Sequence, residues 1–507
     1  MILRYAARRF STSARRLIKE EGWQGKGANV VDLLASRSLL QQTTAPNSLR
    51  KHLDEAERTV YAGVDPSADS LHVGNLLPLL ALLHFVRQGH SAVALIGGAT
   101  GSIGDPSGRD TERSSLSTEQ LQHNVSRITE QVHSFFERAN EHLASKRKGE
   151  GEESPVGKVT VVDNADFYRT MSMLDFLRDV GRYARVGSML ARDSVKNRLQ
   201  PSTPDAAPTG LSFTEFSYQL LQAYDFSVLH KEWNCTVQLG GSDQMGNISA
   251  GIDLIRRRQH SLLESGISEG PESLSQSSEK DEPSPAYGLT LPLLTTSSGA
   301  KFGKSAGNAV WLSSDRCSDY EFYQFFLRCS DGEVRSYLRC LTMLSLEDVD
   351  EILREHDKNR RERIAQRALA REMVLLVRGR KALDRAEIAT KILYEKRIRE
   401  VTREDVLSTF GEEQSTNGKK VLVRLATKDA VGVSIGSLAA STGLVKSRGE
   451  ATRAMKSGGL YVNDVPVKDP RQTLRHQNFV SGNQTLAVLS LGSKEHRILM
   501  IDEIDRS

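Results

Sequence analysis

An alternation of apolar runs and one helical run between residues 58 and 113 constrains the fold of this chain more than any other feature. Residues 59–64 and 91–96 have the apolar, β-branched composition of buried strands, and residues 73–87 between them have that of a helix. The segment 65–70, Asp-Pro-Ser-Ala-Asp-Ser, is typical of a turn. A strand, a crossover helix and a second strand form a βαβ unit, so the sequence predicts an α/β fold with a parallel sheet.

The same alternation continues further along the chain. Residues 158–162 and 236–239 are predicted strands, residues 174–198 are predicted to be largely helical, and residues 247–258 are a predicted helix. The second of these strands runs into Gly-Gly-Ser-Asp-Gln at 240–244. Two polar stretches rich in Ser, Glu, Gly or Lys, 146–158 and 264–285, are predicted surface insertions.

The chain of 507 residues is too long for one ordinary core, so we expect two to four domains. Its four cysteines have no CxxC spacing and no nearby histidine cluster, so we expect neither a disulfide framework nor a metal site. A net charge of +4 permits a polyanionic partner without requiring one. The longest apolar run, 76–86, is about half the ~20 residues that a membrane span needs.

The first residues differ from the rest. Residues 1–19 contain six basic and no acidic side chains, with hydroxyl residues at 11–13. On a helix, their apolar side chains share a face opposite most of the arginines. This composition predicts a mitochondrial targeting segment at 1–20, with a basic RNA-binding arm as the alternative.

Two short motifs predict contacts with nucleotide phosphates. His72-Val73-Gly74-Asn75 stands where a turn opens a helix, and the free N–H groups of a helix N-terminus favour bound phosphate. Gly74 permits close approach of a nucleotide to the backbone. Far downstream, Lys301-Phe302-Gly303-Lys304-Ser305 places two lysines on a loop, where they can stabilise negative charge on departing phosphates. Taken alone, each motif also fits ordinary helix-start or solvated-loop chemistry.

The longer segments around these two motifs indicate a particular protein family. Residues 61–75 closely resemble the signature region of tyrosyl-tRNA synthetases, which are class I aminoacyl-tRNA synthetases, and residues 301–305 resemble the second signature of that family. Residues 97–109, 212–225 and 238–244 are similar to its second βα loop, its tyrosine-pocket helix and its adenosine and amino-acid loop. The family motif usually ends in histidine where this chain has Asn75, which can still donate a hydrogen bond but cannot transfer a proton.

The resemblance implies the substrates L-tyrosine, ATP with Mg²⁺ and tRNA, and a set of binding residues. For tyrosine the implied residues are Tyr61, Asp105, Asn164, Tyr218, Gln222, Asp225, Gln238 and Gln244. The phenol would meet Tyr61 and Asp225, and the ammonium group Tyr218, Gln222 and Asp105. Independently of the resemblance, residues 218, 222 and 225 lie at i, i+4 and i+7, which puts them on one helix face.

For ATP the resemblance implies contacts by Asp65, Gly74, Asp243 and Lys304, and for catalysis His72, Asn75, Ser67, Lys301, Lys304, Ser305, Arg109 and Arg113. The tyrosine carboxylate would attack the α-phosphate without a general base, so that catalysis depends on positioning and charge stabilisation. Tyrosyl-adenylate would then pass its acyl group to the 3′ end of tRNA.

The C-terminal region resembles an S4-type RNA-binding module. Lys446, Arg448, Arg453 and Lys456 are predicted to contact phosphates from a helix that ends at Gly458-Gly459, and a predicted strand at 460–462 follows. A solvated basic helix is the alternative interpretation.

The resemblance therefore implies a Rossmann-type parallel-sheet catalytic domain, an α-helical anticodon-binding domain and a small α+β S4-like domain. The expected ranges are 21–313 with a connective insertion at about 124–208, then 314–411, then 421–507. We also expect a homodimer with an interface near 167–199, and localisation in the mitochondrial matrix.

The sequence bears on three alternative functions. A tryptophanyl-tRNA synthetase is disfavoured by Tyr61 with Asp225, and a small nucleotidylyltransferase by the loop at 301–305 and the RNA-binding tail. An additional role in group I intron splicing is suggested by the basic N-terminal segment and the two polar insertions.

Overall fold

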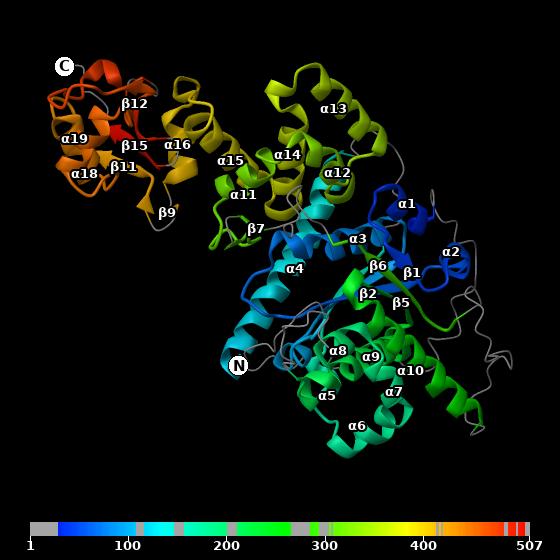
Figure 1. Cartoon of the computed structure of the whole chain (residues 1–507). Coiled ribbons are helices and arrows are strands. Elements are labelled where there is room, and N and C mark those ends of the chain that lie inside the picture. The colour runs from blue at the N-terminus through cyan, green and yellow to red at the C-terminus, as the bar shows by residue number, and fades with distance from the viewer. Residues whose placement is uncertain are drawn as a thin grey trace, which may run out of the picture. The chain divides into compact units, whose positions relative to one another are not determined.

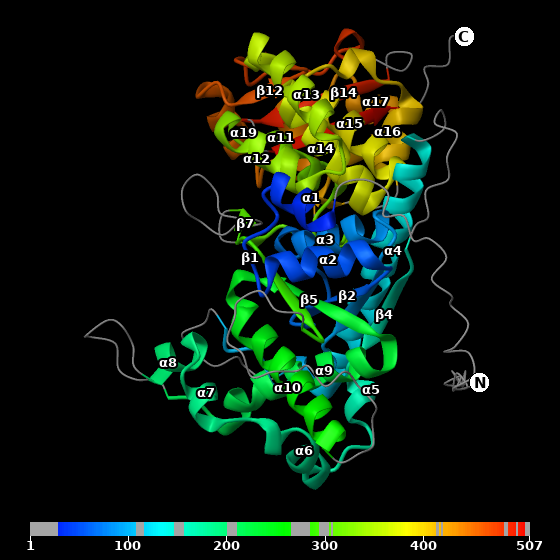
Figure 2. The same cartoon turned by 90° about the vertical axis from the view of Figure 1, so that its right-hand side faces the viewer.

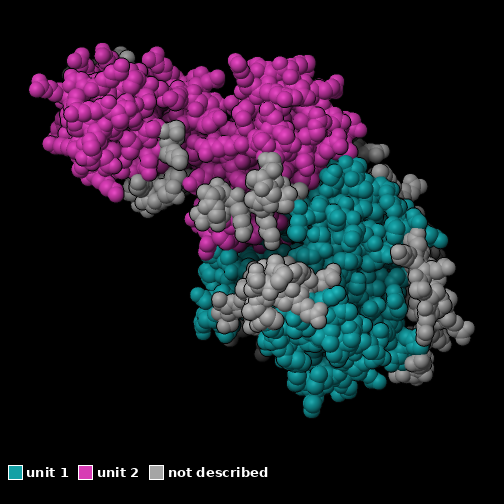
Figure 3. All heavy atoms as spheres, viewed as in Figure 1, with its two compact units in different colours: residues 1–69, 75–129, 151–293 teal, residues 70–74, 130–150, 294–507 magenta. Residues whose placement is uncertain are grey.

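The chain contains two compact units, each formed by several segments. The computed structural model describes residues 29–107, 116–146, 157–199, 210–264, 284–293, 304–305, 308–411, 415–416, 419–480, 485–492 and 495–501. Unit 1 comprises residues up to 69 together with 75–129 and 151–293, and unit 2 comprises 70–74, 130–150 and 294–507 (Figures 1 and 3).

Unit 1 is built on a mostly parallel sheet with the strand order β1-β6-β5-β2-β3-β4. Its strands are β1 (Gln42–Thr43), β2 (Thr59–Val64), β3 (Ser91–Ile96), β4 (Val159–Asp163), β5 (Cys235–Gly241) and β6 (Tyr287–Leu291). All neighbouring pairs are parallel except β1 with β6, where the short edge strand β1 runs antiparallel. The predicted βαβ unit is thereby confirmed, because β2 and β3 have the expected bounds and pair in parallel.

Helices cover both faces of this sheet. The helix α3 (Leu76–Arg87) lies on one face, and α9 (Phe213–Trp233) and α10 (Met245–Glu264) lie on the other (Figures 1 and 2). Almost every side chain of α3 is buried, which explains why its sequence is apolar without a polar face. Two helices were predicted less accurately than the strands: 73–75 form a 3₁₀ turn before α3, and α10 extends beyond the predicted 247–258 at both ends.

Between β4 and α9 the chain forms short helices that run along the side of α9 and α10 away from the sheet (Figure 2). These are α5 (Ala165–Tyr168), α6 (Met173–Asp179), α7 (Val186–Leu190) and α8 (Asp193–Leu199), so the predicted helical stretch 174–198 is broken into pieces. A buried ion pair joins α8 to the first turn of α9, since Arg198 Nη1 lies 2.6 Å from Glu215 Oε1. Unit 1 also contains α1 (Val30–Ser36), α2 (Pro46–Glu55) and the first part of α4 (Thr118–Lys146), residues 118–129.

Unit 2 contains helices that are followed by a small mixed sheet. Its helices are α11 (Asp319–Leu327), α12 (Asp331–Leu341), α13 (Leu346–Lys358), α14 (Ile364–Arg378), α15 (Arg380–Leu393), α16 (Arg403–Phe410), α17 (Thr427–Ala430), α18 (Ile435–Ser441) and α19 (Arg448–Lys456). The second half of α4 (Thr118–Lys146) also belongs to this unit. Ser318 and Thr402 begin α11 and α16 with capping boxes, which satisfy N–H groups that a helix start leaves unpaired.

The mixed sheet has the strand order β11-β15-β14-β12-β13. Its strands are β11 (Leu422–Leu425), β12 (Leu460–Val462), β13 (Val465–Pro466), β14 (Leu486–Leu491) and β15 (Glu495–Ile501). The two-stranded pairs β7 (Lys304–Ser305) with β8 (Asn308–Ala309) and β9 (Ser415–Thr416) with β10 (Lys419–Lys420) complete the described strands. Buried side chains of α18, α19 and this sheet form one core, which includes Leu438, Met455, Leu489 and Leu499. The predicted strand at 460–462 is confirmed.

Among the described residues, no helix has the length and hydropathy needed to cross a membrane.

The core of unit 1 allows a direct test of its packing. Phe226 of α9 is fully buried and its ring lies 5.2 Å from that of Tyr61. We expect Phe226→Ala to lower the free energy of unfolding by about 3–5 kcal/mol, because it removes a large apolar side chain and leaves a cavity. Phe213→Ala, on the same helix but 70% exposed, serves as the control and should change it by no more than ~0.5 kcal/mol in a urea titration. Equal effects of both substitutions would contradict this packing.

Candidate active site

The carboxyl ends of β2, β3 and β4 lie side by side, which is where open parallel sheets bind ligands. Asp65 follows β2, Gly97 and Gly98 follow β3, and Asn164 follows β4. The two glycines allow these segments to come close together. A Cβ on Gly98 would stand 2.2 Å from Asp163 Oδ1, and one on Gly97 would stand 2.3 Å from Asp65 Oδ1.

One group of residues surrounds the buried carboxyl of Asp225. Its side chain accepts a hydrogen bond from Asn164 Nδ2 at 2.9 Å and one from Tyr168 Oη at 2.8 Å. Asp225 is 1% exposed, and this burial raises the pKa of its carboxyl to about 7. Asn164 is also held in place through its own oxygen, which accepts from Ala99 N at 2.8 Å.

Tyr61 lies in the electrostatic field of this carboxyl. It is fully buried on β2, and its hydroxyl finds no hydrogen-bond partner among the described residues. Burial, and secondarily the charge of Asp225, raise the pKa of the Tyr61 phenol well above its usual value, so the hydroxyl stays protonated. A buried hydroxyl without a partner costs free energy unless a ligand satisfies it.

A second group is joined by side-chain amides. Gln244 Nε2 donates to Asp105 Oδ2 at 2.7 Å, and Gln222 Nε2 donates to Gln244 Oε1 at 3.2 Å. Asn247 Nδ2 donates to Gln222 Oε1 at 3.0 Å. The structure therefore brings together three residues that were predicted from segments far apart in the chain.

Tyr218, predicted to contact the substrate ammonium group together with Gln222 and Asp105, is hydrogen-bonded to Asp65. Its hydroxyl donates to Asp65 Oδ2 at 2.9 Å, and Thr100 Oγ1 donates to the other oxygen, Oδ1, at 2.8 Å. The Asp105 charge nevertheless acts on the Tyr218 phenol, whose pKa is raised well above its usual value mainly by burial. Gln238 is buried on β5 beside Tyr61, and its Oε1 has no hydrogen-bond partner among the described residues.

Sequence reasoning missed three residues of this site: Tyr168, Thr100 and Asn247. Tyr168 stands four residues after Asn164 and Asn247 three residues after Gln244, so helical spacing from a predicted residue was the available signal. Thr100 lies within the Gly-rich loop 97–109, where no periodicity singles it out.

Unit 2 contains the histidine of the first motif. The segment 70–73 pairs with 310–313, since Val73 N donates to Val310 O at 2.9 Å and Leu312 N donates to Leu71 O at 2.8 Å. His72 forms an antiparallel bridge with Trp311, and its Nδ1 accepts from Gly74 N at 3.0 Å. The segment that follows the second motif is therefore the direct partner of the segment that carries the first.

Other predicted residues are only partly placed. Ser67 lies in the turn after β2, Asn75 is the N-cap residue of α3, and Asp243 lies in the 3₁₀ turn after β5. Only the backbone of Lys304 and Ser305 is described, as strand β7. Lys301, Arg109, Arg113 and the predicted targeting segment 1–20 lie outside the described residues.

The predicted RNA-binding side chains lie together on and next to α19. Lys446, Arg448, Arg453 and Lys456 are all exposed, whereas Ala451 and Met455 of the same helix face the core. Three of these exposed cations belong to α19, and Lys446 stands just before it. Within the described part of the chain, no group of three or more His, Cys, Asp or Glu side chains is arranged to hold a metal ion.

Comparisons with known proteins identify the family of the chain. A family model described as tRNA synthetases class I (W and Y) matches residues 53–395, and one for the S4 domain matches residues 438–480. The chain is 39% identical over 436 residues, 86% of each chain, to the mitochondrial tyrosine–tRNA ligase of Drosophila melanogaster. It is 38% identical over 473 residues, 93% of this chain and 99% of the relative, to the tyrosine–tRNA ligase of Roseiflexus castenholzii.

Solved structures give the same result. A C-terminally truncated mitochondrial tyrosyl-tRNA synthetase from Aspergillus nidulans matches with a TM-score of 0.61 at 33% identity, over 73% of this chain and 95% of that one. The corresponding structure from Coccidioides posadasii matches with a TM-score of 0.60 at 33% identity, over 71% and 92%.

The raised pKa of Asp225 predicts a stability difference that depends on pH. Because the folded protein binds this proton more tightly than the unfolded chain, stability falls as pH rises from the ordinary value of 3.8 to about 7, and stays lower above it. We expect Asp225→Asn to raise the free energy of unfolding by about 1 kcal/mol at pH 8 and to change it little at pH 4. Asp166→Asn, an exposed neighbour on α5, is the control. This prediction is contradicted if Asp225→Asn raises the free energy of unfolding by no more at pH 8 than at pH 4.

Proposed function

The chain belongs to the class I tRNA synthetases for tryptophan and tyrosine and is a tyrosine–tRNA ligase, and from this premise we propose how its residues divide the reaction. The enzyme activates L-tyrosine with ATP and transfers the tyrosyl group to tRNA. Its fold combines a parallel-sheet catalytic region, a helical region and a C-terminal S4 domain.

The unpartnered Tyr61 hydroxyl next to the buried Asp225 carboxyl is the observation that carries the assignment of the phenol site. A substrate phenol would donate a hydrogen bond to Asp225 and accept one from the Tyr61 hydroxyl. Phenylalanine would fill the same space, leave the buried Tyr61 hydroxyl without a partner at a cost of roughly 1–3 kcal/mol, and add no hydrogen bond to Asp225. Tyr168 and Asn164 hold the Asp225 carboxyl in the orientation that this recognition needs.

The amide group is proposed to receive the other end of the amino acid. Asp105 supplies negative charge for the substrate ammonium, and Gln222 and Gln244 supply amide oxygens that can accept its protons. Tyr218 would join them when the ammonium group enters, because its ring already lies in the field of Asp105. Gln238, with its buried and unpartnered oxygen, is available to the substrate as well.

In the activation step the tyrosine carboxylate attacks the α-phosphate of ATP, and pyrophosphate leaves. A carboxylate is ionised at neutral pH, so the reaction requires positioning and charge stabilisation rather than a base.

We assign His72 and Ser67 to the γ-phosphate, and Asp243 to the ribose. Gly74 and the backbone at Asp65 permit close approach of the nucleotide, and Asn75 donates to it. The departing pyrophosphate is assigned to Lys301, Lys304, Ser305, Arg109 and Arg113. Mg²⁺ would enter with ATP as part of the substrate.

The transfer step requires tRNA to be held by other parts of the chain. The exposed cations Lys446, Arg448, Arg453 and Lys456 are proposed to contact phosphates from the S4 domain, and the helical domain at 314–411 is proposed to meet the anticodon arm.

Exposed apolar side chains on α6 and α7 support a homodimer. Leu174 is 75% exposed, Val186 63% and Met173 61%, which is unusual for large apolar residues on neighbouring short helices. Val180, which also lies in the predicted interface region 167–199, is instead buried in the core formed with α9 and α10. We propose that the exposed set pairs with its copy across a two-fold axis.

The cellular location is proposed from composition and relatives together. Relatives from an insect and two fungi are named mitochondrial. We propose that residues 1–20 direct the chain to the mitochondrial matrix, because their basic, acid-free composition is typical of targeting segments.

Tyrosine-dependent exchange of pyrophosphate into ATP tests the assignment of the phenol site. We expect Tyr61→Phe to lower kcat/KM for tyrosine by about 10-fold, since one hydrogen bond to the phenol is lost, and to leave kcat/KM for phenylalanine nearly unchanged. Tyr394→Phe, at an exposed tyrosine, should behave as wild type. Exchange with tryptophan but not with tyrosine would overturn the assignment.

Sedimentation velocity tests the proposed dimer. We expect the wild-type enzyme to sediment as a dimer and Leu174→Asp to shift it toward monomer, because a charge would be buried in an apolar interface. Val465→Asp, at a 65% exposed apolar residue on β13, should leave the dimer unchanged. A monomeric wild-type enzyme, or an equal shift in both variants, would refute the interface.

A further inference from the structure

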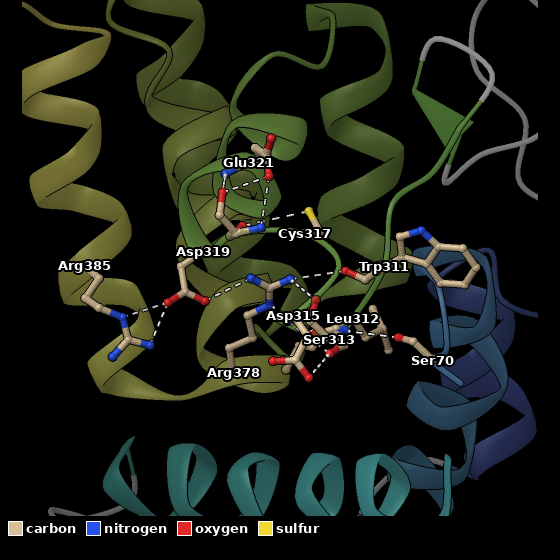
Figure 4. Close-up of polar contacts among 12 residues, drawn as sticks. Ser70, Trp311, Leu312, Ser313, Asp315, Cys317, Asp319, Glu321, Arg378 and Arg385 are labelled. Atoms are coloured by element: carbon tan, nitrogen blue, oxygen red, sulfur yellow. Dashed lines mark hydrogen bonds and ion pairs between the residues drawn. The ribbon is translucent and has the colours of Figure 1, made fainter. Parts of the chain in front are cut away.

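A single buried arginine holds the segment that follows the second ATP motif. Arg378, the last residue of α14, has a side chain that is only 4% exposed. Its Nε donates to Leu312 O at 3.2 Å, and its Nη2 donates to Trp311 O at 3.2 Å and to Ser313 O at 3.4 Å (Figure 4). Three successive backbone carbonyls are therefore bound by one guanidinium group.

The charge of Arg378 is balanced on its other side. Nη1 donates to Asp319 Oδ1 at 2.9 Å, and the second oxygen of Asp319 accepts from Arg385 Nε at 2.8 Å (Figure 4). The guanidinium also lies 4.3 Å from the ring centroid of Phe322. This arrangement needs the planar, five-donor geometry of arginine, which the ammonium group of lysine cannot reproduce.

The three bound carbonyls belong to the strand that pairs with the first ATP motif. Leu312 N donates to Leu71 O at 2.8 Å, and Ser313 N donates to Ser70 Oγ at 3.2 Å. Trp311 forms the antiparallel bridge with His72, and the two rings lie edge to face with their centroids 6.3 Å apart. A shift of residues 311–313 would therefore also move the backbone and ring of His72.

We propose that Arg378 is a positioning residue for the ATP half-reaction. It fixes residues 311–313 from the helical region, and these in turn fix the segment 70–73 and thus the place of the His72 ring. The proposal rests on the role at the γ-phosphate assigned above to His72. It predicts that a change at Arg378, which itself touches no substrate, alters the use of ATP and not the binding of tyrosine.

The experiment compares two conservative substitutions in the full-length enzyme. Arg378→Lys keeps the charge and removes the contacts to several carbonyls at once. We expect it to lower kcat/KM for ATP in pyrophosphate exchange by about 10-fold, the equivalent of one or two lost hydrogen bonds, with KM for tyrosine unchanged. The matched control is Arg385→Lys, because Arg385 also binds Asp319 but contacts none of the three carbonyls; it should stay within about 2-fold of wild type.

Active-site titration normalises each rate to the folded enzyme. Arg378→Lys with a lower melting temperature but wild-type ATP kinetics per active site would show a merely structural role and overturn the proposal. Equal reductions in kcat/KM for ATP and for tyrosine in Arg378→Lys would also overturn the proposal. If Arg378→Lys does not fold, Ser70→Ala tests the same link from the opposite strand, and it should lower kcat/KM for ATP by about 3-fold. Unchanged ATP kinetics in Ser70→Ala would then refute the link.

A double mutant separates this proposal from the role of His72. If Arg378 acts through His72, Arg378→Lys should cause no further loss in an enzyme that already carries His72→Ala. If the reductions in kcat/KM for ATP caused by Arg378→Lys and His72→Ala are fully additive, the positioning role of Arg378 is refuted, whereas the role of His72 is not. Unchanged ATP kinetics in His72→Ala would instead refute the assigned role of His72.

Discussion

The carboxyl of Asp225 is removed from water inside unit 1, and the arrangement of the surrounding residues follows from the need to keep it partnered. Asn164 supplies one donor, and because its oxygen also binds Ala99, the same residue ties the end of β4 to the loop after β3. Gly97 and Gly98 make this close approach possible. The protein thus holds an acid in an environment that disfavours its charge, which is common where a protein recognises a polar group of a ligand.

Recognition and stability oppose each other at this site. An unpartnered hydroxyl on Tyr61 and a carboxyl with a pKa near 7 both destabilise the empty protein. The surrounding apolar packing, with Phe226 against the Tyr61 ring, offsets part of that cost. A ligand that hydrogen-bonds to both polar groups recovers this free energy. The preference for a phenol over a phenyl ring therefore comes from polar groups that the protein already holds in place.

Much of the fold could be predicted because strands and helices have recognisable local sequence patterns. The strands β2 and β3 were placed correctly, since apolar runs of that length between turn residues have few alternatives. The pocket helix was predicted from the resemblance of residues 212–225 to the family, and the spacing of Tyr218, Gln222 and Asp225 added only that they share one helix face. Contacts between distant segments could not be derived in this way. Nothing near Tyr218 in the sequence indicates that Asp65 accepts a hydrogen bond from its hydroxyl. Nothing near Arg378 indicates that it binds three carbonyls more than sixty residues upstream. The edge strand β1, with two residues, is too short to show any periodicity.

The chain passes between its two units repeatedly, since the five residues 70–74 belong to unit 2 while the chain on either side of them belongs to unit 1. This short excursion carries His72, and its backbone partners lie at 310–313, beyond the end of unit 1 in the sequence. Neither unit can therefore be produced intact by cutting the chain at a single position. A truncation between residues 74 and 310 would remove the backbone partners of the first motif, so the order of His72 depends on a segment more than two hundred residues away in the sequence.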